Sequence, residues 1–177
     1  MDVTVERLTP HSLLESACTM TLRPGATSTV SFEEMLRCEH SPIRTQIYWI
    51  KLLEIPTFIS VHLVRHKIGV EHFVQSMRRN PNQTAVNRLT PVNHGMLINA
   101  QALIQMSRKR LCLKSAAETV AVWTKVRKRM IWTDSMMASF MVPECVYRNG
   151  MCPEIKQCRP GTTKVCSAYP KWVDDPH

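Results

Sequence analysis

Cationic and polar side chains are dense between residues 63 and 80, in the segment LVRHKIGVEHFVQSMRRN. Its chemically active members are Arg65, His66, Lys67, Glu71, His72, Gln75, Ser76, Arg78 and Arg79. Guanidinium, ammonium and imidazole groups supply charge-assisted hydrogen bonds to phosphates and other anions. The pattern therefore predicts an anion-binding site. A solvated basic surface is the alternative, because runs of charge usually face water.

The size and charge of the chain suit an anionic partner. It has 177 residues, of which 44 % are apolar, and a formal net charge of +9. These values predict one packed domain with a tail, and a nucleotide or nucleic acid as partner. Aromatic residues make up only 6 % and do not alternate with the basic ones, which makes nucleic acid the less favoured partner.

The chain contains no apolar run near the roughly 20 residues that a membrane span needs. Residues 1–10, MDVTVERLTP, also lack the apolar core of a signal peptide. We therefore expect a soluble, cytoplasmic protein without a membrane partner.

The first half of the chain predicts alternating strands and short helices. Ser12 with Glu15, and Ser31 with Glu34, have capping-box spacing, and Pro56 suits the first turn of a helix. In chain order we expect a strand over 3–8, a helix from Ser12 that ends before Pro24, a helix from Ser31 to about Cys38, a loop over 39–44, a strand over 46–55 and a helix over 56–65.

The second half predicts a loop followed by two helices. Residues 79–95 are rich in Asn, Pro and Thr, and helices should follow over 95–110 and 115–131, the second opened by a capping box of Ser115 and Glu118. This second helix should bury Ala117, Val120, Ala121 and Trp123 and expose Lys125, Arg127, Lys128 and Arg129. We expect a catalytic domain over 1–142 and a Cys-rich tail over 143–177.

The seven cysteines allow two interpretations. Their odd number, and the apparently buried helical positions of Cys18, Cys38 and Cys112, favour reduced thiols over a disulfide framework. The tail cysteines could bind zinc as thiolates, but their spacing lacks the short knuckle typical of zinc sites. These tail residues are Cys145, Cys152, Cys158 and Cys166. An irregular tail that covers a core is the alternative.

The order of motifs resembles the flavin-dependent thymidylate synthases. The resemblance rests on an HSP loop at residues 40–42, on RHK at 65–67 and QSMR at 75–78, and on Asn99, Arg110 and Glu118 further along. The opening Thr9-Pro10 also fits. The chain departs from the family pattern with Lys67 for the third signature Arg, Val70 or Glu71 for a Ser, His72 or Phe73 for an Asn, and Arg44 and Thr45 for a Glu-His pair.

The resemblance implies an α/β (α+β) fold of the thymidylate synthase-complementing type, an antiparallel sheet with packed helices. It implies methylation of dUMP, a pyrimidine deoxynucleotide, with FAD, NADPH and 5,10-methylenetetrahydrofolate, in a homotetramer with composite sites. By the same resemblance, Gln75, Ser76 and Arg78 bind the nucleotide, and Arg110 contacts the pyrimidine as the catalytic residue. Arg65, His66, Lys67, His72 and Asn99 bind the cofactor.

Alternatives remain for the reaction and for individual residues. The same scaffold could hydroxymethylate a pyrimidine deoxynucleotide with folate, with Cys152 as a covalent nucleophile. A basic nucleic-acid-binding module that uses residues 125–129 and the tail is the alternative of another class. His66 and His72 could be structural histidines, and Arg110 could simply complement the dipole at a helix C-terminus.

Overall fold

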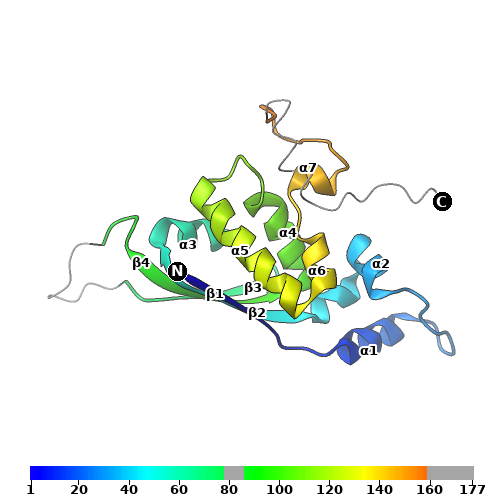
Figure 1. Cartoon of the computed structure of the whole chain (residues 1–177). Helices are drawn as coiled ribbons and strands as arrows, with labels where there is room; N and C mark the ends of the chain where they lie inside the picture. Colours follow the sequence, from blue (N-terminus) through cyan, green and yellow to red (C-terminus); the bar gives the residue numbers. More distant parts are fainter. Residues whose placement is uncertain (78–85, 159–177) are drawn as a thin grey trace. The chain divides into compact units, whose positions relative to one another are not determined.

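The computed structural model describes residues 1–77 and 86–158. The chain divides into two compact units, of which the first covers residues 1–102 and the second begins at residue 103. Figure 1 labels the helices and strands. Each unit is described below by itself. The predicted boundary between a catalytic domain, 1–142, and a Cys-rich tail, 143–177, remains a prediction.

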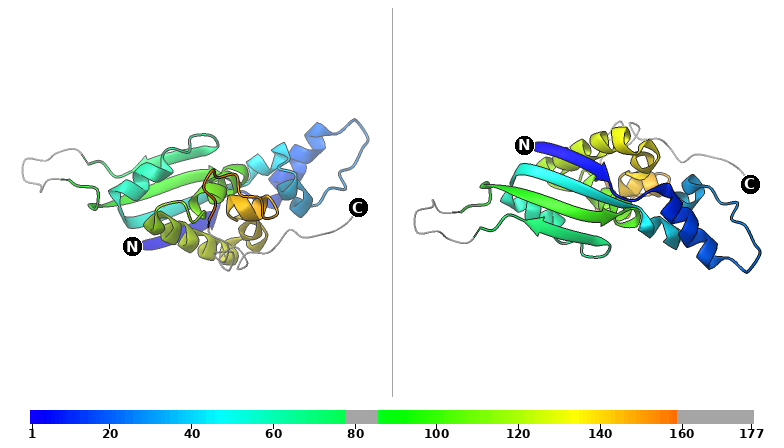
Figure 2. Two further views of the ribbon diagram at one scale, coloured as in Figure 1. Left: turned by 90° about the horizontal axis from the view of Figure 1, so that it is seen from above. Right: turned by 90° about the horizontal axis from the view of Figure 1, so that it is seen from below.

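The first unit contains a four-stranded antiparallel sheet in the order β1-β2-β4-β3. The strands are β1 (Asp2–Arg7), β2 (Ile47–Pro56), β3 (Val70–Val74) and β4 (Pro91–Asn99). The helix α3 (Thr57–Leu63) packs on β2 and β4 (Figure 2). The predicted antiparallel sheet with packed helices is therefore confirmed, as are the strands expected over 3–8 and 46–55.

One face of the sheet forms the core of this unit. Tyr48, Ile50 and Leu52 alternate along β2 and are completely buried. The pairing of β2 with β4 shifts between Leu52 and Ile55, and Glu54 lies there at a φ of 55°. This β-bulge adds one residue to β2, so that Ile55 also turns inward and is buried.

The expected loop over 79–95 is wrong for residues 91–95, and the expected helix over 95–110 is wrong for residues 95–99, because residues 91–99 form β4. Residues 86–90 lie outside any helix or strand, as expected, and residues 79–85 lie outside the described residues. Every second residue of β4 points inward, and Val92, Met96 and Ile98 are three of these buried residues. The strand pairs with β2, so sheet pairing overrides the turn propensity of Asn and Gly here. The helix α4 (Ala100–Arg110) begins directly after the strand. The side chain of Asn99 starts it by accepting a 2.9 Å hydrogen bond from the N–H of Ala102.

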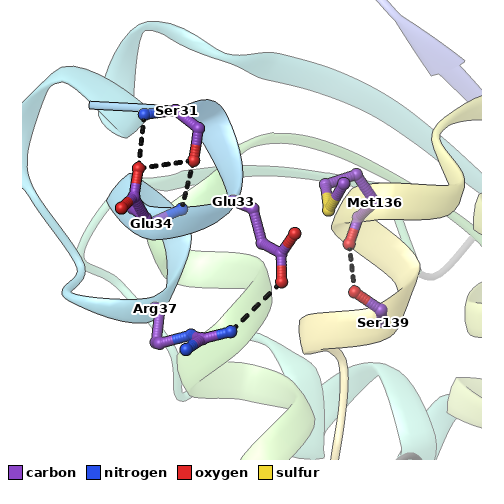
Figure 3. Close-up of polar contacts among 6 residues, drawn as sticks. All are labelled: Ser31, Glu33, Glu34, Arg37, Met136 and Ser139. Carbon is purple, nitrogen blue, oxygen red and sulfur yellow. Dashed lines mark hydrogen bonds and ion pairs between the residues drawn. The ribbon is translucent and has the colours of Figure 1, made fainter. Parts of the chain in front are cut away.

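Two short helices precede β2. The helix α2 (Phe32–Arg37) has the predicted capping box, with Ser31 Oγ accepting from Glu34 N and the Glu34 carboxylate accepting from Ser31 N (Figure 3). An i,i+4 ion pair between Arg37 and Glu33 follows at 3.2 Å. The helix α1 (His11–Thr21) begins after Pro10, so the predicted capping by Ser12 is wrong. Residues expected as a loop form the short 3₁₀ helix η1 (Ser41–Thr45).

The helix α3 is shorter than the expected 56–65. Pro56 is its N-cap, and the helix ends at Leu63. Residues 65–67 therefore lie beyond the helix and not in its last turn. No helix in the described part of the chain is long and apolar enough to cross a membrane.

The second unit is helical. It contains most of α4, followed by α5 (Ala117–Thr133), α6 (Ser135–Phe140) and α7 (Glu144–Tyr147). The expected capping box at Ser115 is wrong, because Ala116 is the N-cap of α5 and Ser115 Oγ donates instead to the carbonyl of Lys109. Asp134 caps α6, accepting from Met137 N at 2.9 Å. Within α6, Ser139 Oγ donates to the carbonyl of Met136 (Figure 3).

The buried face of α5 differs from the one that the sequence predicts. Trp123 is buried as expected, but Ala117 and Ala121 are exposed and Val120 is half-buried. The buried positions are Thr119, Val122, Trp123, Val126 and Met130. Lys125, Lys128 and Arg129 are exposed as predicted, whereas Arg127 is half-buried and donates to the carbonyl of Met141 at 3.0 Å.

Candidate functional site

The RHK segment forms the turn by which the chain leaves α3. Val64 N donates to Ser60 O, and His66 N donates to Leu63 O, both at 3.0 Å. The side chains of Arg65 and Lys67 are exposed, and neither forms an ion pair within residues 1–77 and 86–158. The turn thus holds two exposed positive charges that can pair with an anion. We call residues 64–69 the cationic turn.

The cationic turn is held to the sheet by a histidine of β3. His72 Nε2 lies 2.7 Å from the backbone oxygen of His66. His72 Nδ1 lies 2.9 Å from His94 Nε2 on β4, with the two rings at 61° to one another. The structure therefore brings together two predicted cofactor-binding residues, His66 and His72, by a contact between backbone and side chain.

His94 is the functional candidate that the sequence interpretation missed. It is 1 % exposed, and its Nδ1 atom is buried without a hydrogen bond in the described part of the chain. Burial, and secondarily the positive charge that His72 can carry, lowers the pKa of His94 from its ordinary 6.5 to about 4. A histidine within the period-two pattern of Val92, Met96 and Ile98 is the signal that could have indicated it.

Acidification should destabilise the wild-type fold more than that of a His94→Leu variant. The unfolded chain binds a proton at His94 near pH 6.5, whereas the folded chain binds it only near pH 4. The stability that the neutral ring contributes is thus complete above pH 6.5 and is lost as the pH falls toward 4, by up to about 3 kcal/mol. Urea unfolding of both proteins across this range measures the difference. Parallel pH dependences would contradict the expectation.

The predicted nucleotide-binding residues follow directly after β3. Gln75 is tied to β4, because its N–H donates to Asn93 O at 2.9 Å and its Oε1 accepts from Asn93 N at 3.0 Å. Its Nε2 amide makes no hydrogen bond within the described residues and can donate to a ligand. Ser76 is exposed. Arg78, the predicted phosphate ligand, lies outside the described residues.

Asn99 lies next to Gly69, the last residue of the cationic turn before β3. Its N–H donates to Gly69 O at 2.9 Å, and a Cβ built on Gly69 would come within 2.5 Å of the Asn99 amide. Gly69 also has a φ of 73°, which favours glycine. Because Asn99 also caps α4, its side chain has a clear structural role, and its predicted cofactor role remains a prediction.

The HSP loop forms η1 and is joined to the first turn of α4. Arg44 Nε donates to Gln101 Oε1, and Gln101 Nε2 donates to Glu39 at 3.4 Å. Glu39 has a φ of 49°, a conformation that non-glycine residues rarely adopt. The hydrogen bond of Arg44 thus joins this loop to the first turn of α4.

Arg110 is the last residue of α4 and is half-exposed in the second unit. Its neighbours in this helical turn are engaged with α7. Lys109 lies 3.6 Å from Glu144, and the Arg108 guanidinium lies over the ring of Tyr147, 3.3 Å from its centroid. The roles of Arg110 as a catalytic residue and as a helix-end cation both remain predictions.

The cysteines of the described part, 1–77 and 86–158, are all free thiols. Cys18 is buried as predicted, but Cys38 is exposed and Cys112 only half-buried. Cys145, Cys152 and Cys158 are half-buried, and Cys166 lies outside the described residues. No group of three His, Cys, Asp or Glu side chains within the described part could hold a metal ion. The zinc alternative, which includes Cys166, remains a prediction.

The described architecture is shared with solved nucleotide-binding enzymes. UMP/dUMP methylase PolB from Streptomyces cacaoi, bound with 5-Br dUMP, aligns with a TM-score of 0.54 and 13 % identity over 78 % of this chain and 94 % of its own. Two structures of thymidylate synthase X (ThyX) from Helicobacter pylori with FAD and dUMP align with TM-scores of 0.59 and 0.55, both at 11 % identity. They cover 77 % and 75 % of this chain, and 99 % and 97 % of their own.

These alignments confirm the predicted α+β fold of the thymidylate synthase-complementing type. At such low identity they establish the fold alone. No family model and no curated protein sequence matches the chain.

Proposed function

We propose that this chain is an enzyme that transfers a one-carbon unit to C5 of a pyrimidine deoxynucleotide, methylating dUMP as a flavin-dependent thymidylate synthase does. The observation that carries the proposal is the cationic turn. Arg65 and Lys67, at the positions of the family's RHR signature, are exposed cations without an ion pair among the described residues. The fold shared with two enzymes whose structures hold dUMP or 5-Br dUMP supports the same class of substrate.

The donors of the cationic turn fit FAD, because guanidinium and ammonium groups form charge-assisted hydrogen bonds to the pyrophosphate of a dinucleotide. Bound FAD would supply the hydride of the reaction, with NADPH as its reductant and 5,10-methylenetetrahydrofolate as the carbon donor. In this proposal Arg65 and Lys67 bind the anionic part of the cofactor, with His66, His72 and Asn99 shaping its surroundings.

The nucleotide would lie at the residues that follow β3. The Nε2 amide of Gln75 can donate to a pyrimidine carbonyl, and the exposed Ser76 hydroxyl can donate to or accept from the nucleotide. Arg78 would bind the phosphate as a bidentate partner. Arg110 would stabilise the negative charge that develops on the pyrimidine when C5 attacks the one-carbon unit. As in the family that the sequence resembles, we propose a homotetramer with composite sites.

Removing the two cations of the turn should weaken cofactor binding. Each charge-assisted hydrogen bond contributes about 1.5–3 kcal/mol, so Arg65→Ala and Lys67→Ala should each raise the dissociation constant of FAD by about 10- to 100-fold. Lys125→Ala, at an exposed lysine of α5, is the matched control and should bind FAD as the wild type does. Flavin absorbance during titration measures all three variants.

The purified protein itself tests the proposed reaction. Its absorbance spectrum, mass spectrometry of the small molecules released on denaturation, and calorimetric titration with dUMP, UMP and dCMP identify cofactor and base. Flavin together with dUMP binding supports the methylation. A colourless protein that exchanges the C5 proton of a pyrimidine nucleotide when folate is added indicates the hydroxymethylase instead. Absence of nucleotide binding, together with strongly salt-dependent binding of DNA or RNA, would overturn both.

A further inference from the structure

The contacts of His72 determine which of its nitrogens carries hydrogen. The carbonyl oxygen of His66 can only accept, so His72 Nε2, at 2.7 Å, must be the donor. A neutral His72 then has a bare Nδ1, which must accept from His94 Nε2–H at 2.9 Å. His94 is left with a bare, buried Nδ1 that has no hydrogen-bond partner in the described part of the chain.

The opposite arrangement is less favourable. If His72 carried hydrogen on both nitrogens, His94 Nε2 would have to be bare and the hydrogen of His94 would move to Nδ1. That would bury an N–H group without an acceptor, which costs more than a bare lone pair in the same place. The pair is therefore most stable with one hydrogen on each Nε2, which is the tautomer that binds the cationic turn.

We propose that His94 is a positioning residue of the candidate site: it fixes the tautomer and orientation of His72, so that His72 Nε2–H holds the backbone of the turn that carries Arg65 and Lys67. A hydrogen-bonded pair of strands supplies the rigidity, because His72 and His94 lie on neighbouring strands of one sheet. The positioning role of His94 depends on the proposed function only in one respect, that the cationic turn binds FAD.

The surroundings of the pair contain cations but few other titratable groups. Along β2, the inward side chains near His94 are Ile50 and Leu52, with Tyr48 two positions further. Glu71 and Lys51 alternate to the opposite face of the sheet. The remaining titratable side chains on the first-unit elements that pack against β3 and β4, and on the cationic turn, are Glu54 of β2, His62 of α3, Arg44 of η1, and Arg65, His66 and Lys67 of the turn.

Nitrogen-15 NMR of the imidazole rings in the full chain tests the proposal directly. At neutral pH we expect hydrogen on Nε2 and a bare Nδ1 in both His72 and His94. A wild-type His72 with hydrogen on Nδ1 and a bare Nε2 would overturn the proposal without any variant.

Two variants separate positioning from simple packing. His94→Gln keeps an N–H donor near the Nε2 position, whereas His94→Leu keeps an apolar side chain and removes the donor. We expect His94→Leu to mix the His72 tautomers, to speed amide hydrogen exchange in residues 66–68, and to weaken FAD binding by about five- to tenfold. His94→Gln should restore all three. Equal behaviour of the two variants, or an unchanged His72 tautomer in His94→Leu, would contradict the proposal.

The two levels of inference fail in different ways. If the wild type binds neither FAD nor dUMP, the proposed function fails, while the tautomers and the exchange of residues 66–68 still decide whether His94 positions the turn. If the wild type binds FAD and His94→Leu binds it equally well with an intact tautomer, the positioning role fails and the proposed function stands.

Discussion

In the proposed reaction, replacing Arg110 with glutamine is expected to lower turnover of dUMP by about 100- to 1,000-fold while dUMP binding changes little. The reason is that a donor aimed at charge that develops only in the transition state contributes little to binding of the ground state. Arg110→Lys should lose much of this activity too, since an ammonium group keeps the charge but not the planar fork. Product formation by the reduced enzyme and calorimetric dUMP titration measure the two effects separately.

The alternative role of Arg110 gives a different result. As a cation at the C-terminus of α4, it would contribute about 0.3–1 kcal/mol to stability, and Arg110→Gln would lower the melting temperature without a change in turnover. Lys125→Gln, on the exposed side of α5, is the control for removing a positive charge from the same unit. Normal turnover in Arg110→Gln would assign the residue to the helix end.

The sequence predicts the elements whose signals are local. The inward residues of β2 alternate with period two, and α2 begins with a Ser31–Glu34 capping box, so both are confirmed. The same spacing fails at Ser12 and Ser115. The N-cap of α1 is Pro10, and the N-cap of α5 is Ala116, so neither serine caps its helix. Ser115 Oγ donates instead to the carbonyl of Lys109. Capping-box spacing thus permits a serine to cap a helix, but the residue at which the helix begins also depends on the proline or loop before it.

The elements missed are those that depend on distant partners. The strand β4 contains Pro91, Asn93 and Gly95, which locally favour a turn. Pairing with β2 on one side and β3 on the other makes it one of the two inner strands of the sheet. Gly95 is required in that position, because a Cβ there would come within 2.7 Å of the Trp49 ring. A turn-forming residue can therefore mark a close approach between strands.

The candidate site shows the same limit. The RHK motif and its cationic character follow from the sequence, because they depend on residue types alone. The His72 ring that contacts the motif is itself in contact with His94, 22 residues further along the chain. The pairing of β3 with β4 brings these rings together, and the sequence does not predict that pairing, because residues 91–95 locally favour a loop.

Removing the Trp123 side chain is expected to have the largest effect on stability. Trp123 is completely buried in the second unit, and its Nε1–H donates to Ser107 Oγ at 3.0 Å, where Ser107 is also buried. Trp123→Ala should lower the free energy of unfolding by about 3–5 kcal/mol, because it leaves a large cavity. Trp132→Ala is the matched control on the same helix, since Trp132 is 88 % exposed and its loss should cost less than about 0.5 kcal/mol.

The hydrogen bond can be separated from the packing by a double-mutant cycle. Ser107→Ala leaves the indole N–H buried without an acceptor, which should cost about 1–3 kcal/mol. In a Trp123→Phe background there is no N–H to satisfy, so the same substitution of Ser107 should cost clearly less. Urea unfolding followed by circular dichroism measures all four proteins. Equal costs of Ser107→Ala in the two backgrounds would show that the indole N–H does not depend on Ser107, and that the core of the second unit is held by apolar packing alone.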